Sequence, residues 1–103
     1  MSIRWMRTAQ IANGKFMEAI AWAKEASGYV EKKWSTPPVH VWLDAFGTVG
    51  TMRWSMDLTD FSQFEKIQGQ MLTDQGYWQL VDKAFKNQLF VDGSSVDYVS
   101  RQL

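Results

Sequence analysis

Apolar and polar residues alternate in some segments of this chain and follow a helical period in others. Residues 3–10 alternate and contain β-forming side chains, which is typical of a strand. Between residues 15 and 34 the apolar positions recur at steps of four and three, which places them on one face of a helix. That face comprises Phe16, Ile20, Ala23, Ser27, Val30 and Trp34. Asn13 precedes this segment and is predicted to cap the helix.

A β-hairpin is the clearest element in the sequence. Ser35-Thr36-Pro37-Pro38 ends the helix, and strands are predicted over residues 39–46 and 49–57, joined by a tight turn at Gly47-Thr48. In this register one side of the hairpin carries the pairs Phe46–Val49, Asp44–Thr51, Trp42–Arg53 and His40–Ser55. The other side carries Ala45–Gly50, Leu43–Met52, Val41–Trp54 and Val39–Met56. One side is thus apolar and the other is aromatic and polar, a separation that a one-residue slip would destroy.

The remaining segments predict two helices and a final strand. Thr59 or Asp60 caps a helix with apolar residues on one side, namely Phe61, Phe64, Ile67 and Met71. Thr73 or Asp74 begins the next helix, whose inward residues are expected to be Tyr77, Val81, Ala84 and Phe85. A loop at 92–95 leads to a strand over 96–103. The order β-α-β-β-α-α-β predicts one layered α+β domain over residues 1–103, with helices on one face of a four-stranded sheet.

Composition makes a homodimer the simplest expectation. The chain has 103 residues, of which 46% are hydrophobic and 15% aromatic, with Trp 6. A domain of this size has a modest core, so part of this surface should line a cavity or contact a partner. Because the helices cover the apolar side of the hairpin, the side with Trp42, Phe46 and Val49 would face water. A second copy packed face to face would cover it.

Charge and residue usage exclude several classes of function. Lys+Arg 11 and Asp+Glu 11 balance, which argues against nucleic-acid binding and a basic membrane anchor. Cys 0 rules out disulfides and thiolate metal sites, and a single histidine leaves no metal-ligand set. No uncharged stretch approaches the roughly 20 residues of a membrane span. Residues 1–15 lack an apolar leader, so a cytoplasmic location is expected. Neither a cofactor nor a metal is expected.

The chain resembles NIPSNAP-like members of the dimeric α+β-barrel superfamily. The resemblance lies in IRWMRT at residues 3–8 followed by IANGK at 11–15, and in the paired helices of residues 60–85. It implies a ferredoxin-like domain whose sheet forms one barrel with that of a second subunit. Members of the superfamily include cofactor-free monooxygenases, haem-degrading enzymes and small-ring isomerases, so the fold does not fix the function. Haem-degrading members use a histidine on the second helical segment, and this chain has none there.

His40 is the only histidine and therefore the candidate catalytic residue. It is either a general base inside the barrel or a strand residue near solvent. Asp44 stands about 13 Å along the same strand, too far to orient the imidazole. Ser55 lies directly opposite, but no aspartate of this strand pair stands behind it, so a serine-hydrolase triad is not supported.

The candidate ligand-binding residues are Trp42, Asp44, Arg53, Ser55 and Arg7. Trp42 is the best ligand-facing aromatic, and Arg53 opposite it permits a cation–π contact. Arg53 is either an anion clamp or the partner of Asp44 in a salt bridge. Arg7 belongs to the same set. Both faces of its strand carry apolar and polar residues, so the sequence does not determine which face Arg7 occupies.

Three functional hypotheses follow. The first is a homodimer that binds a small hydrophobic or aromatic molecule in a cavity between sheet and helices, without a cofactor. The second is a cofactor-independent monooxygenase or isomerase of a small aromatic or polyketide-like substrate. The third is a structural dimer without a pocket. Cavity size separates the third from the others.

Overall fold

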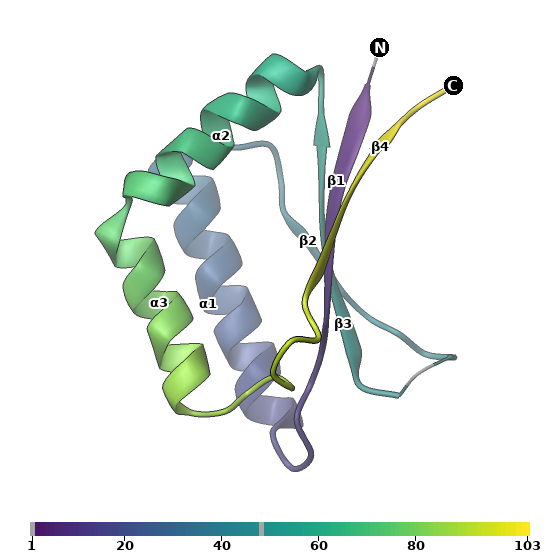
Figure 1. Cartoon of the computed structure of the whole chain (residues 1–103), viewed down its shortest axis with the longest axis vertical. Coiled ribbons are helices and arrows are strands. Elements are labelled where there is room, and N and C mark those ends of the chain that lie inside the picture. Colours follow the sequence, from purple (N-terminus) through teal and green to yellow (C-terminus); the bar gives the residue numbers. More distant parts are fainter. Residues whose placement is uncertain (1, 48) are drawn as a thin grey trace.

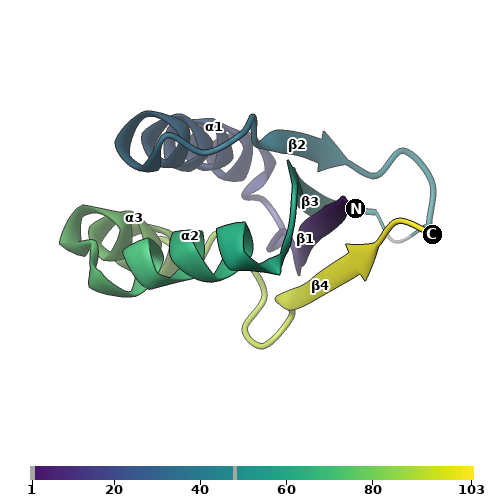
Figure 2. The same ribbon diagram turned by 90° about the horizontal axis from the view of Figure 1, so that it is seen from above.

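The chain forms an antiparallel four-stranded sheet with three helices on one face, as a computed structural model describing residues 2–47 and 49–103 shows (Figures 1 and 2). The strand order is β2-β3-β1-β4. This is the ferredoxin-like α+β arrangement that the sequence predicts. The elements, in chain order, are β1 (Ile3–Gln10), α1 (Phe16–Trp34), β2 (His40–Leu43), β3 (Thr51–Leu58), α2 (Phe61–Thr73), α3 (Gln75–Lys86) and β4 (Val96–Arg101).

The predicted hairpin register is confirmed where the two strands pair. The Cα partners in the ladder are His40↔Ser55, Val41↔Trp54, Trp42↔Arg53 and Leu43↔Met52. One further backbone hydrogen bond, from Asp44 N to Thr51 O at 3.0 Å, extends the pairing. The tight turn predicted at Gly47-Thr48 includes a position outside the described residues.

Both strands of the hairpin are shorter at the turn than the sequence pattern predicts. Gly47 and Gly50 have φ of 93° and 87°, in the left-handed region that glycine tolerates and that extended strands do not use. The predicted pairs Phe46–Val49 and Ala45–Gly50 therefore fall outside the ladder. The last strand also ends early, at Arg101 rather than at residue 103.

The helix starts follow the predicted caps in two of three cases. Asp60 accepts a hydrogen bond from Gln63 N at 2.9 Å, and Asp74 accepts one from Tyr77 N at 3.2 Å. The prediction of Asn13 as a cap was wrong, because the chain first makes a turn at Gly14 (φ 79°) and α1 starts only at Phe16. Phe85 was wrongly placed inward; it is 71% exposed near the end of α3.

The two halves of α1 pack differently against the sheet. In the first half Ala19 and Ala23 are fully buried and share a core cluster with Met52 of β3. Small side chains let the helix approach the strands closely there. Towards its carboxyl end α1 leans away from the sheet, and α2 crosses that end of the molecule (Figure 1). Within the described residues, no helix is long and apolar enough to cross a membrane.

Candidate functional site

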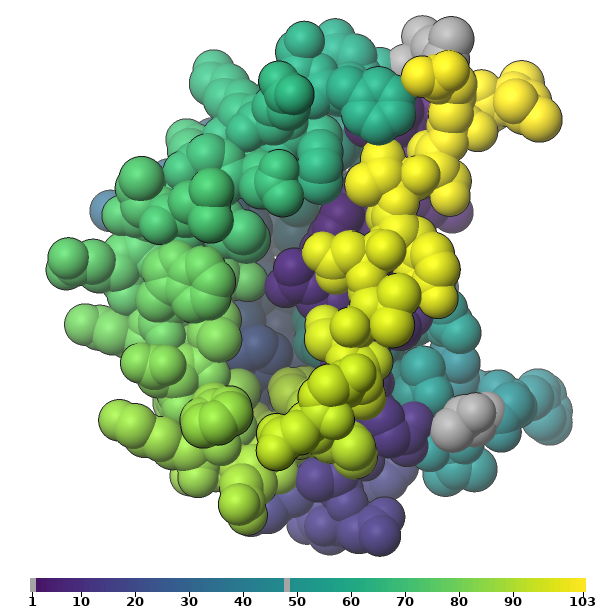
Figure 3. Space-filling view, viewed as in Figure 1, coloured from purple at the N-terminus to yellow at the C-terminus, as the bar shows by residue number. Residues whose placement is uncertain are grey.

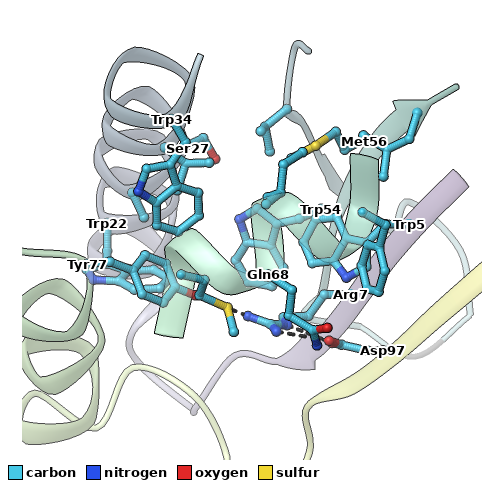
Figure 4. A pocket seen from close by; sticks show the side chains of 17 residues that line it. Trp5, Arg7, Trp22, Ser27, Trp34, Trp54, Met56, Gln68, Tyr77 and Asp97 are labelled. Carbon is cyan, nitrogen blue, oxygen red and sulfur yellow. Dashed lines mark hydrogen bonds and ion pairs between the residues drawn. The ribbon is translucent and has the colours of Figure 1, made fainter. Parts of the chain in front are cut away.

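A cavity of about 130 Å³ lies between the covered face of the sheet and the helices. In Figure 3 the surface is hollowed between the green helices α2 and α3 and the yellow strand β4. All helices and three of the strands contribute to the wall, some of whose side chains are labelled in Figure 4. The lining residues are Trp5, Arg7, Trp22, Ala26, Ser27, Val30, Trp34, Val39, Trp54, Met56, Leu58, Phe64, Ile67, Gln68, Met71, Tyr77 and Asp97.

Tryptophans supply much of the apolar wall, and hydrogen bonds fix the orientation of two of them. Trp22 Nε1 donates to Leu80 O at 2.8 Å, and Trp34 Nε1 donates to Asp74 Oδ2 at 2.7 Å. The rings of Trp22 and Trp54 pack edge to face with centroids 6.4 Å apart, a favoured geometry for aromatic pairs. With their indole N–H groups engaged elsewhere, Trp22 and Trp34 present ring carbon to the cavity.

Asp74 holds the part of the wall where α1 meets α3. Its carboxylate accepts hydrogen bonds from the Tyr29 hydroxyl and from Trp34 Nε1, both at 2.7 Å, besides capping α3. These donors favour the charged carboxylate, with Tyr29 the largest cause, and lower the pKa of Asp74. The neighbouring rings of Trp34 and Tyr77 lie with centroids 5.2 Å apart. One carboxylate thus positions Trp34 in the cavity wall and Tyr29, which lies outside that wall.

We expect this carboxylate to make the fold sensitive to acid. Because the pKa of Asp74 is lower in the folded chain than the ordinary value of about 3.9, its contribution is present above that pH and is lost as the pH falls through the lowered pKa. Asp74→Asn should therefore lower the urea midpoint at neutral pH, and its difference from the wild type should shrink below about pH 4.

The matched control for this prediction is Asp82→Asn, on the exposed side of α3. It should leave the midpoint unchanged at every pH. A difference between Asp74→Asn and the wild type that persists undiminished in acid would contradict the proposed role of the charge.

The polar end of the cavity is an ion pair between β1 and β4. Arg7 Nε and Nη2 donate to the two carboxylate oxygens of Asp97 at 2.7 and 2.9 Å, and Arg7 Nη1 reaches the Tyr77 hydroxyl at 3.4 Å. The guanidinium also lies over the Trp5 ring, 5.4 Å from its centroid. The hydrogen bonds to Asp97 are the main cause that raises the pKa of Arg7, and they lower the pKa of Asp97. The two formal charges therefore cancel at the cavity.

Ser27 of α1 is the other polar residue of interest in the wall. The residue is 8% exposed, and its Oγ is enclosed without a hydrogen-bond partner among the described residues. Figure 4 shows it beside Trp34, on the α1 side of the cavity. Buried hydroxyls are normally hydrogen-bonded in native proteins.

Five of the six predicted site residues lie on the opposite, uncovered face of the sheet. Arg53 Nε and Nη2 donate to the Asp44 carboxylate at 2.8 and 3.0 Å, so Arg53 forms the salt bridge that was one of its two expected roles. These hydrogen bonds are the largest cause that lowers the pKa of Asp44 and raises that of Arg53. Trp42 Nε1 donates to Ser55 Oγ at 3.0 Å.

His40 is exposed at the edge of this face, with its ring centroid 6.1 Å from that of Trp42. It stands opposite Ser55 in the ladder, as predicted, and the Ser55 hydroxyl accepts its hydrogen bond from Trp42. Among residues 2–47 and 49–103, no three His, Cys, Asp or Glu side chains are grouped to hold a metal ion.

Arg7 is separated from the other five predicted residues by the sheet. The structure places Arg7 in the cavity wall with Asp97, and places Trp42, Arg53 and Ser55 on the other face. The pairing Arg7↔Asp97 between β1 and β4 is what brings the cavity's two charges together. Sequence reasoning missed most of the cavity. A serine within the apolar stripe of α1 is a signal that could have pointed to it, because a polar residue on the covered face of a helix is unusual.

Comparison with known proteins gives a likeness of fold. No protein-family model matches the chain, and no curated protein sequence matches it either. A NIPSNAP family protein from Agrobacterium tumefaciens superposes with a TM-score of 0.81 at 14% identity, over 100% of this chain and 94% of that one. An uncharacterized NIPSNAP-like domain protein from Burkholderia xenovorans gives 0.80 at 10% identity, over 99% and 85%.

An enzyme of known class has the same architecture. An antibiotic biosynthesis monooxygenase superposes with a TM-score of 0.71 at 8% identity, covering 98% of both chains. At these identities the comparison concerns the fold alone. The chain is therefore a ferredoxin-like α+β domain that shares its fold with NIPSNAP family proteins and with an antibiotic biosynthesis monooxygenase.

Proposed function

We propose that this chain is a homodimeric α+β-barrel protein that binds a small hydrophobic or aromatic molecule in the cavity between sheet and helices. The observation that carries the proposal is the cavity itself, about 130 Å³ and walled mainly by aromatic and aliphatic side chains. An apolar cavity of about 150 Å³ engineered into another protein takes up benzene. A molecule with one ring therefore matches the space in size and polarity.

The uncovered sheet face supports the dimer. Trp42 is 54% exposed and Tyr98 is 50% exposed, and beyond the strands Phe46 and Val49 are 93% and 78% exposed. Contiguous apolar surface of this kind marks interaction sites on soluble proteins. The Arg53–Asp44 pair lies among these residues with its charges already matched, so a second sheet can cover it without stranding a charge. The same face of a second copy carries the same exposed aromatic residues and the same neutralised ion pair, so the two faces can pack together.

Toluene is expected to bind the purified protein in the cavity. Because Trp5, Trp22, Trp34 and Trp54 line it, binding should change the intrinsic fluorescence, excited where toluene does not absorb. Ala26 forms part of the wall at 7% exposure, and Ala26→Leu places three further carbons in the space. This variant should bind toluene at least about tenfold more weakly, the equivalent of roughly 1.4 kcal/mol.

The control for this experiment is Ala21→Leu, an exposed position on the same helix. It should bind toluene like the wild type. If the wild type takes up no toluene, or if both leucine variants bind it equally well, the cavity is not a ligand site and a structural dimer becomes the better description.

The second candidate function is a cofactor-independent monooxygenase or isomerase. The fold shared with an antibiotic biosynthesis monooxygenase favours it. Chemistry in this cavity would use the polar groups that line it, Arg7 and Tyr77, rather than His40 on the other face of the sheet. The test is oxygen uptake with hydroquinone as substrate. A rate above the spontaneous oxidation that is abolished in Ala26→Leu would favour this candidate over simple binding.

A further inference from the structure

The Ser27 hydroxyl has unused hydrogen-bonding capacity in the wall of the cavity. Its Oγ is enclosed, and in the part of the chain that the structure describes nothing donates to it or accepts from it. A buried hydroxyl without a partner destabilises the fold, so such groups in native structures call for an explanation. A bound molecule that supplies the missing partner is one explanation that the cavity makes available.

Three of the donor residues around the cavity, Arg7, Trp22 and Trp34, are already engaged. Arg7 is bonded to Asp97 and to the Tyr77 hydroxyl. The indole N–H groups of Trp22 and Trp34 donate to Leu80 O and to Asp74. A ligand that sought a partner among these groups would have to displace an existing hydrogen bond. At Ser27 no hydrogen bond would be lost, and the enclosed Oγ becomes reachable once the side chains around it shift slightly.

The charge balance of the wall constrains the ligand further. The bidentate contact between Arg7 and Asp97 leaves no net charge there. An ionised group placed against this wall would lose its hydration without gaining a counter-ion. The ligand should therefore be neutral, with a single ring to match a volume of about 130 Å³.

We propose that Ser27 is a specificity-determining residue and that the cavity takes neutral single-ring compounds bearing a hydroxyl group, of which phenol is the simplest. This inference rests on the proposed function, because it names the ligand class of the same cavity. The ligand hydroxyl exchanges a hydrogen bond with Ser27 Oγ, and the ring packs against the tryptophans.

Phenol and toluene provide the test, because they differ only in a hydroxyl in place of a methyl. A wholly apolar cavity favours toluene, since the phenol hydroxyl loses its hydrogen bonds to water. With Ser27 as partner, phenol should bind the wild type at least as tightly as toluene. Ser27→Ala should weaken phenol about tenfold and change toluene less than about threefold. Benzoate should bind at least about tenfold more weakly than phenol.

Thr36→Val is the matched control. Thr36 carries the other enclosed hydroxyl without a partner among the described residues, and it does not line the cavity. The control should leave both affinities unchanged. Should Ser27→Ala fail to fold, Ser27→Cys keeps the side chain's shape and replaces the hydroxyl with a weak donor, and it should show the same selective loss of phenol binding.

The outcomes separate this inference from the proposed function. If toluene binds the wild type, and phenol binds the wild type no more tightly than it binds Ser27→Ala, the cavity is a binding site but the role of Ser27 is overturned. A trapped water that satisfies the Ser27 hydroxyl would give this result. If benzoate binds as tightly as phenol, the neutral ligand class is wrong. If neither toluene nor phenol binds the wild type, the proposed function itself fails.

Discussion

Replacing Trp42 by glutamate is expected to dissociate the proposed homodimer into monomers. Trp42 lies on β2 in the uncovered face of the sheet, 54% exposed, beside the Arg53–Asp44 pair. If a second sheet packs on this face, the new carboxylate is buried without a partner, because the neighbouring guanidinium is already bonded to Asp44. Losing a tryptophan anchor alone typically costs about 2 kcal/mol or more, so dissociation should become at least about thirtyfold easier.

Sedimentation at several protein concentrations would measure this change. The control is Phe85→Glu, which puts the same charge on an exposed aromatic position of α3, on the helical side of the molecule. It should leave the dimer intact. A wild-type protein that sediments as a monomer at all concentrations would refute the dimer. Dissociation by Phe85→Glu but not by Trp42→Glu would move the interface to the helices.

Met52→Ala is expected to lower the free energy of unfolding by about 3 kcal/mol. Met52 is 1% exposed and is the largest fully buried side chain among the described residues. It packs in the core cluster with Ala19 and Ala23, which have no side-chain atoms beyond Cβ to move into the space. On the α1 side the vacated volume therefore stays open, the condition under which such truncations cost most.

Urea unfolding at one fixed protein concentration tests this expectation, because a dimer's apparent stability depends on concentration. Met17→Ala makes the same chemical change at a position that is 77% exposed, and its midpoint should stay close to that of the wild type. A loss below about 1 kcal/mol for Met52→Ala would mean that the helix settles onto the sheet and fills the gap.

The features that the sequence predicts well are those set by local chemistry. The hairpin register was predictable because polarity alternates along residues 39–46 and 49–57. Only one register places the apolar residues on one face and the polar residues on the other. Asp60 and Asp74 were predictable as caps because a short carboxylate before a helical period bonds the free backbone N–H groups there.

The cavity was harder to predict, because it depends on contacts between distant segments. Arg7 and Asp97 meet only through the register of β1 with β4, which no local pattern determines. Both faces of β1 are mixed, so the sequence left open which face carries Arg7. Phe85 was misplaced because its position next to Ala84 near the end of α3 put it at the margin of the apolar stripe.

The tight packing of the first half of α1 has a consequence for how the binding space can change. Ala19 and Ala23 set how closely the first half of α1 approaches the sheet, whereas Tyr29 and Trp34 hold its far half to α3 through Asp74. A bulkier residue in place of either alanine should push the helix away from the sheet. This would change the volume of the cavity without altering any residue that lines it. The size of the molecule that the proposed binding cavity accepts should thus be adjustable by substitutions that do not touch it.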